Sequence, residues 1–140
     1  MKSLLNLFVR VHVALFRATK GRVASSMEGI QLLLLTTTGR KTGKKRTVPV
    51  MYFEDGGRRF IVASAGGNAK HPAWYANLQA NPEVVVEVPG QSYEARATAV
   101  TPEVRAHMWQ KIVEQAPRFG GYANKTEGKR EIPVVELQPN

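Results

Sequence analysis

The sequence contains no cysteine, and its other candidate metal ligands and catalytic groups are sparse. Without cysteine the protein has no disulfide, no thiolate metal site and no cysteine nucleophile. The three histidines, His12, His71 and His107, follow no metal-binding spacing, so we expect no metal site. Hydrolase chemistry is poorly supported, because no acid pair is placed for general acid and base work and Ser64 lacks a G-x-S-x-G elbow.

Acidic residues are also few, since 11 Asp and Glu face 20 Lys and Arg and leave a net charge of +9. This charge favours an anionic partner, which could be a nucleic acid, an anionic membrane or a phosphorylated or polycarboxylate cofactor. The few aromatic residues are not interleaved with the basic cluster, as they are in many single-strand binders. We therefore expect no nucleic-acid partner, and a non-enzymatic nucleic-acid-binding barrel is kept as an alternative.

Long apolar runs are missing too. Residues 1–20 form the most apolar candidate, but Arg10 and His12 interrupt it and no cleavage site follows, so it fits neither a spanning helix nor a signal peptide. The spacing instead predicts an amphipathic basic helix within residues 1–25, followed by a loop over 21–29. Its expected apolar face consists of Leu4, Phe8, Val11 and Leu15. This helix either packs on its own domain or lies on a membrane surface.

The segment that most needs an explanation is 32–46, LLLLTTTGRKTGKKR. Leucines that pass into β-branched threonines predict a strand buried on both faces, ending at Gly39. Five cations follow at once: Arg40, Lys41, Lys44, Lys45 and Arg46. Crowded cations repel one another, so the turn indicates a bound polyanion, with a solvated basic loop as the alternative. The turn is not a Walker A motif, because the glycine spacing is too short.

Hairpin signals dominate the next part of the chain. Strands over 47–54 and 59–65 flank Asp55-Gly56-Gly57. We expect Val48, Val50 and Tyr52 on one face of the first strand. Met51 and Phe53 should lie on the other face. Pro49 cannot donate to a strand ladder and therefore predicts an edge, a bulge or a ligand contact.

The remaining elements predict the fold class. They are a short helix over 72–78, a hairpin over 84–88 and 92–100, a helix that Thr101 caps and Pro117 ends, a glycine-rich loop over 118–130 and a strand over 132–137. Six or so antiparallel strands with short helices indicate an α+β, mainly antiparallel β fold, a small β-barrel in one domain. This pattern excludes a βαβ arrangement. Any enzyme chemistry is then expected to come from a cofactor.

Four motifs in this order resemble the deazaflavin-dependent nitroreductase family: TTTGRKTGKKRTVPV, the D-G-G hairpin, VASAGGNAKHPAWYANLQANPEVVVEV and YANKTEGKREIPVVEL. Members are flavin/deazaflavin oxidoreductases with a split β-barrel that use coenzyme F420. The resemblance implies an FMN-binding split-barrel-like domain over 26–140. It also implies hydride transfer to a hydrophobic acceptor such as a quinone, nitro compound or activated alkene. FMN is the alternative cofactor, because a phosphate-binding turn does not by itself reveal whether the cofactor carries an oligoglutamate tail.

The resemblance also implies a set of site residues. The phosphate and oligoglutamate tail would contact Arg40, Lys41, Thr42 and Arg46. The backbone beside the ring would come from Val48, Pro49, Val50 and Met51. The rest of the groove would be lined by Val62, Ala63, Ser64, Ala65, Ala73, Trp74, Tyr75, Ala76 and Asn77. On the acceptor side we expect Tyr122 and Ser64 as catalytic hydrogen-bond donors and Phe119 as an apolar wall. The protein would be a cytoplasmic monomer or homodimer, with the membrane alternative placing it at the inner face of the cell membrane.

Overall fold

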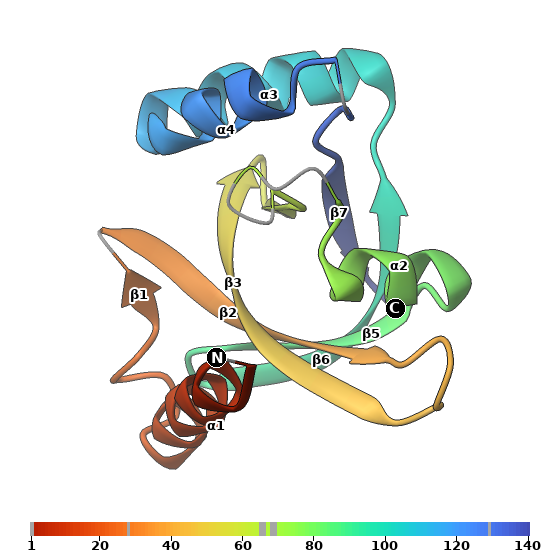
Figure 1. Ribbon diagram of the computed structural model, residues 1–140. Coiled ribbons are helices and arrows are strands. Elements are labelled where there is room, and N and C mark those ends of the chain that lie inside the picture. Colours follow the sequence, from red (N-terminus) through yellow and green to blue (C-terminus); the bar gives the residue numbers. More distant parts are fainter. Residues whose placement is uncertain (1, 28, 65–66, 68–69, 129) are drawn as a thin grey trace.

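The computed structural model describes residues 2–27, 29–64, 67, 70–128 and 130–140, with side chains from Asn6 onward (Figure 1). The elements in chain order are α1 (Lys2–Ala18), β1 (Ser26–Met27), β2 (Ile30–Thr38), β3 (Lys45–Asp55), β4 (Arg58–Val62), α2 (Ala73–Ala80), β5 (Glu83–Val88), β6 (Gln91–Ala99), α3 (Pro102–Gln115), α4 (Arg118–Thr126) and β7 (Val134–Pro139). The predicted α+β, mainly antiparallel β class is confirmed.

Six strands close into an antiparallel barrel in the order β2, β3, β4, β7, β6, β5, and β5 pairs again with β2. The short strand β1 pairs with β2 outside this ring, within the segment predicted as a loop. Figure 1 shows α3 and α4 together at one end of the barrel, α1 at the opposite end and α2 beside the strands. Closure leaves few open strand edges, which is how small barrels limit intermolecular pairing.

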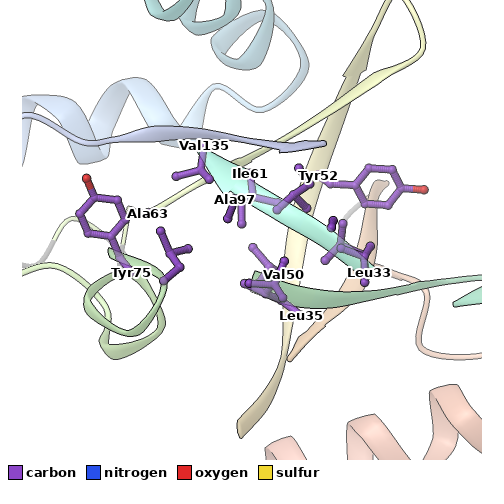
Figure 2. Close-up of a cluster of buried hydrophobic side chains, with 14 of the residues drawn as sticks. Leu33, Leu35, Val50, Tyr52, Ile61, Ala63, Tyr75, Ala97 and Val135 are labelled. Atoms are coloured by element: carbon purple, nitrogen blue, oxygen red, sulfur yellow. The ribbon is translucent and has the colours of Figure 1, made fainter. Parts of the chain in front are cut away.

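The barrel interior is filled by alternate residues of the strands. Leu33 and Leu35 from β2 meet Val50 and Tyr52 from β3, and the exposed fraction of none of them exceeds 8% (Figure 2). Leu34 points outward and is equally buried, against α1. The predictions that the leucine strand is buried on both faces and that Val50 and Tyr52 share one face are therefore confirmed.

A second core lies between the barrel wall and the helices α3 and α4. Met51 and Phe53 face this core, as their alternation with Val50 predicts. The predicted cap of α3 is also present, since the Thr101 hydroxyl accepts a hydrogen bond from the Val104 amide at 3.4 Å. Met108 and Ile112 bring the apolar face of α3 into the same core.

The loop predicted over 118–130 is wrong in its first two thirds, because α4 occupies Arg118–Thr126. The glycine pair at 120–121 favoured a loop, and a helical repeat of inward-facing residues was therefore missed. This repeat consists of Phe119, Tyr122, Ala123 and Thr126. Spacings of three, four and seven residues place these side chains on one helix face, so burial overrides the low helix propensity of glycine.

Helix α1 packs on the barrel, but through a different face from the predicted one. Val13 and Phe16 are 9% and 3% exposed and contact Leu34. Phe8, Val11 and Leu15 are instead 58%, 50% and 46% exposed, while Leu4 has no described side chain. The helix carries two apolar faces about 140° apart, and its sequence alone does not say which one packs. No helix in the described residues is both long and apolar enough to cross a membrane.

Candidate active site

The cationic turn, residues 39–46, connects β2 to β3 and is closed by its own backbone. The Gly39 amide donates to the Lys44 carbonyl and the Gly43 amide to the Gly39 carbonyl, both at 2.8 Å. The Lys44 amide donates to the Thr42 hydroxyl at 3.2 Å. A Cβ atom on Gly39 would lie 2.8 Å from that hydroxyl, so a larger residue would force the turn open. The turn therefore has a fixed shape that holds its cations together.

Asn77 of α2 ties this turn to the barrel. Its Oδ1 accepts a hydrogen bond from the Arg40 amide at 3.2 Å, and its Nδ2 donates to the Thr37 hydroxyl at 3.3 Å. Asn77 and Thr37 are 7% and 1% exposed, so the bond between them forms away from bulk water, whereas the bond to the Arg40 amide is partly buried. Within residues 39–44, the amides of Lys41 and Thr42 have no hydrogen-bond partner in the described part of the chain, which leaves both able to donate to a ligand.

The cations of the turn are exposed. Among the described residues, Arg40, Lys41 and Arg46 form no ion pair with an acid. Lys45 differs, because its ammonium donates to the Thr38 hydroxyl at 2.8 Å. Neighbouring positive charges without acidic partners create a positive potential that attracts anions. This is the electrostatic condition that the sequence predicted for a polyanion site.

Two hollows meet at this turn. The α2 groove, about 670 Å³ in volume, lies between the cationic turn and α2. It is lined by Asn6, Thr37, Gly39, Arg40, Lys41, Thr42, Arg46, Val48, Ala73, Trp74 and Asn77. The α1 groove, about 630 Å³, continues beneath α1 and shares Asn6, Arg46 and Val48 with the first. Together they form a surface large enough for an elongated ligand with an anionic part.

The α2 groove brings together eight of the residues predicted to bind a cofactor. They are Arg40, Lys41, Thr42, Arg46, Val48, Ala73, Trp74 and Asn77. Three lining residues were missed by sequence reasoning, namely Asn6, Thr37 and Gly39. The spacing of Asn6 with Arg10 on the polar face of α1 was the available signal, and Arg10 lines the α1 groove.

Several other predicted residues do not line either groove with their side chains. Val50, Ala63 and Tyr75 fill the barrel core (Figure 2), and Val62 and Met51 face the second core. Ala76 lies on α2 outside the lining, and Ala65 lies outside the described residues. For β3 the prediction concerned the backbone, and there the structure offers a free strand edge.

The free edge comprises residues 45–51 of β3. In the described part of the chain these residues pair with β2 alone, whereas β4 pairs with β3 only from Tyr52 onward. Pro49 lies within this half, opposite Leu34. Its predicted place at an edge is confirmed, because a residue without an N–H group is tolerated where the ladder has one side only.

Ser64 and Tyr122, the two predicted catalytic residues, both lie close to Gly67, beyond the end of β4. The Gly67 amide donates to the Ser64 carbonyl at 2.9 Å, and Ser64 is 9% exposed. Gly67 has a φ of +82°, and a Cβ there would lie 3.2 Å from the Cα of Tyr122, so only glycine lets α4 approach this turn. Phe119 is 4% exposed under the Tyr122 ring, with ring centroids 5.4 Å apart, and so belongs to the second core.

The donor set of this region suits an organic anion better than a metal ion. Among the residues that the structure describes, no three His, Asp or Glu side chains are grouped to hold a metal. The groove instead offers cations, two free amides, the Thr42 hydroxyl and the Trp74 side chain. Guanidinium and ammonium groups with backbone amides bind phosphates and carboxylates, while an aromatic wall accepts a flat ring.

Comparison with known proteins places this geometry in a family. The family model described as F420H(2)-dependent quinone reductase matches residues 8–139. An F420H(2)-dependent quinone reductase of Mycobacterium tuberculosis is 41% identical over 133 residues, which cover 92% of this chain and 88% of that protein.

Two solved structures are also similar over most of the chain. One, an F420-H2 dependent reductase, has a TM-score of 0.69 and 42% identity, and covers 76% of this chain and 93% of its own. The other, a domain-swapped dimer, has a TM-score of 0.72 and 37% identity, and covers 92% and 94% of the two chains. The family is an oxidoreductase family that uses coenzyme F420, and the split-barrel prediction is confirmed. The chain belongs to the F420H(2)-dependent quinone reductase family.

Proposed function

We propose that this protein binds reduced coenzyme F420 in the α2 groove and uses it to reduce a quinone. The observation that carries the proposal is the groove itself, where cations without acidic partners in the described chain meet the aromatic and apolar wall of α2. The phosphate and oligoglutamate tail of F420 supply the negative charges that this groove would neutralise. The family to which the chain belongs supports both the cofactor and the reaction.

The cofactor-binding roles follow from the positions of the residues. Arg40, Lys41 and Arg46 bind the phosphate and the tail, helped by the free amides of Lys41 and Thr42. The free edge of β3, next to Val48, would hold the deazaflavin ring. This edge supplies backbone groups that no second strand occupies in the described part of the chain. A rigid edge holds a flat ring in one orientation, and fixed orientation lowers the barrier to transfer.

The chemistry of the step is a two-electron reduction. Reduced F420 supplies a hydride when bound, and the acceptor must also gain a proton. The residues of this chain orient the acceptor and stabilise the negative charge that grows on its oxygen. Tyr122 and Ser64 are our candidates for that role, and their shared proximity to Gly67 supports the idea that they act together. A nitro compound or an activated alkene would be accepted by the same donors.

Turnover with a menaquinone analogue tests the proposed reaction. Purified protein, reduced F420 and the analogue should restore the absorbance band of oxidised F420 as quinone is consumed. Tryptophan quenching should show tight binding of F420 and weak binding of FMN, because FMN lacks the anionic tail that the cationic turn would grip. Absence of both turnover and F420 binding would refute the proposal. If the protein instead binds FMN and turns over with it, the cofactor is FMN and not F420.

The exposed face of α1 makes contact with the membrane that holds the quinone, at its cytoplasmic side. All exposed large apolar side chains of the described residues lie in one segment of the sequence, 7–27, and four of the six are on α1: Leu7, Phe8, Val11, Leu15, Val23 and Met27. Exposed basic residues Arg10, Lys20 and Arg22 lie in the same segment. An apolar patch with a basic surround supports binding to anionic lipid surfaces.

Vesicle flotation tests this contact. The protein should float with vesicles that contain phosphatidylglycerol and much less with phosphatidylcholine alone. The double variant Phe8→Ser and Val11→Ser should weaken flotation by about tenfold or more, since each apolar side chain contributes up to about 1.5–3 kcal/mol when buried. F420 affinity should stay unchanged. Equal flotation of variant and wild type would remove the patch from the proposal.

The oligomeric state is a monomer or a homodimer. One similar structure is a domain-swapped dimer, which supports the dimer for this chain as well. Light scattering after size exclusion separates the two states directly, and dilution shows whether a dimer exchanges.

A further inference from the structure

Arg130 gathers three separate parts of the chain at the exit of β4. It follows α4, and its amide donates to the Thr126 carbonyl at 3.0 Å. Its Nη1 donates to the Ala63 carbonyl at 3.1 Å, and its Nη2 donates to the Ser64 carbonyl at 2.6 Å. The same Nη1 donates to Nδ1 of His71 at 3.0 Å. One guanidinium therefore joins the end of α4, the end of β4 and the segment that leads into α2.

Two of the groups held by Arg130 belong to segments that the proposed function uses. Ser64 is one of the two candidate donors toward the acceptor. His71 directly precedes Pro72, the residue that caps α2, and its ring packs on Tyr75 with centroids 4.8 Å apart. Ala73, Trp74 and Asn77 of α2 form one wall of the α2 groove. Because Arg130 contacts both segments, their relative position depends on it.

The hydrogen bond to His71 also fixes the protonation of that ring. A guanidinium has donors only, so Nδ1 of His71 must accept, and the neutral ring carries its proton on Nε2. Burial and the positive charge of Arg130 both lower the pKa of His71, which keeps the imidazole neutral. Burial likewise lowers the pKa of Arg130 itself, but an arginine stays charged at any physiological pH.

Lysine could not replace this arrangement. The guanidinium is a planar fork whose two terminal nitrogens reach the neighbouring carbonyls of Ala63 and Ser64 and the His71 ring together. An ammonium is a single point with three donors, and it would have to give up part of this set. The pattern of acceptors thus requires the shape of arginine as well as its charge.

We propose that Arg130 is a positioning residue for the hydride transfer, which sets the Ser64 segment against the α2 wall by bonding the Ala63 and Ser64 carbonyls and His71. This inference rests on the proposed F420 site. Arg130 itself lines neither the α2 groove nor the α1 groove. Its effect on the reaction is therefore exerted through Ser64 and α2.

The test compares Arg130→Lys and Arg130→Gln with the wild type in turnover with reduced F420 and a menaquinone analogue. We expect kcat to fall by about tenfold or more in both, because small displacements of positioned groups cost that much. F420 affinity should change far less, since the cationic turn is untouched. In ¹⁵N NMR, His71 should change from the single Nε2–H tautomer to a mixture in Arg130→Gln.

Four control variants make the result specific. Arg96→Lys and Arg96→Gln change an exposed arginine whose partner is Glu83, and they should leave kcat and the His71 tautomer unchanged. His71→Asn keeps an acceptor near the Nδ1 position, so it should retain more activity than His71→Leu. The NMR signals that disappear in His71→Asn are those of His71, so this variant also assigns them.

The outcomes separate this inference from the proposed function. Wild-type protein that fails to bind F420 refutes the proposed function, while the tautomer measurement still reports whether Arg130 holds His71. Wild-type kcat and tautomer in both Arg130 variants would overturn the positioning role. A kcat loss matched by an equal loss of folded protein in Arg130→Lys would also overturn it.

Discussion

The cationic turn and the Arg130 cluster are each connected to α2, the turn through Asn77 and the cluster through His71, but they are built in different ways. The turn is one short segment, 39–46, whose side chains are exposed and whose cations make few bonds to the described protein. The Arg130 cluster joins residues 63, 64, 71 and 130, and its hydrogen bonds are satisfied within the protein. The turn is therefore suited to ligand binding and the cluster to fixed geometry. Variants at the two places should separate affinity from turnover.

The largest expected effect comes from removing cations of the turn. Each charge-assisted hydrogen bond contributes about 1.5–3 kcal/mol, so Lys41→Ala or Arg46→Ala should weaken F420 binding by about tenfold to a hundredfold, and the double variant more. Thermal stability should hold, because both side chains are exposed. Quenching of tryptophan fluorescence measures the affinity, since Trp74 lines the groove.

Arg96→Ala is the matched control for this prediction. It removes one positive charge from an exposed ion pair with Glu83, away from the grooves. Its F420 affinity should equal that of the wild type. If Lys41→Ala and Arg46→Ala behave like Arg96→Ala, the turn is a solvated loop and its contrast with the Arg130 cluster disappears.

A smaller effect is expected at Asn77, which lines the α2 groove and also bonds the cationic turn. Asn77→Asp keeps the acceptor for the Arg40 amide but places a negative charge beside the groove. We expect F420 affinity to fall by about tenfold, and added salt to reduce this penalty because it screens the repulsion. Thr37→Val removes the other partner of Asn77 without any charge, and should have a weaker effect that salt does not change.

The smallest effect on the site should come from Glu136, which pairs with Arg58 far from both regions. Arg58 donates to both carboxylate oxygens, at 2.8 and 2.7 Å, and this hydrogen bonding lowers the pKa of Glu136. A lowered folded-state pKa stabilises the fold above the unfolded value of about 4.3, and this contribution is lost as the pH falls through the folded value. Glu136→Gln should thus lower Tm at pH 7.

The pH series supplies the check on that variant. The difference in Tm between wild type and Glu136→Gln should shrink as the pH is lowered below about 4, where the carboxylate of the wild type becomes protonated. F420 affinity at pH 7 should be the same for both. A loss of affinity in Glu136→Gln would mean that stability and binding are not separable in this barrel.

The parts of the molecule that could be predicted from sequence are those with a local cause. Alternation placed Val50 and Met51 on opposite faces, and the Thr101 cap marked the start of α3. The cationic turn was visible because five cations follow one glycine. Each of these signals lies within a few residues of the structure that it predicts.

The parts that escaped prediction depend on contacts between distant segments. Helix α4 forms despite two adjacent glycines, because the second core buries Phe119 and contacts Tyr122 and Ala123. The packed face of α1 depends on Leu34, which lies far along the chain. Arg130 and His71 are 59 residues apart, and no local pattern links them. The division of the chain at residue 25 and the catalytic roles of Tyr122 and Ser64 stay predictions.

The free edge of β3 has a consequence for solubility at high protein concentration. A strand with one unpaired side is a template on which another chain can add a strand, and this is a common start of aggregation. Pro49 removes one donor from that half-strand, and the exposed charges of Lys45 and Arg46 repel an identical copy. The protein can therefore leave one stretch of backbone unpaired for a small molecule while disfavouring strand pairing with another copy of itself.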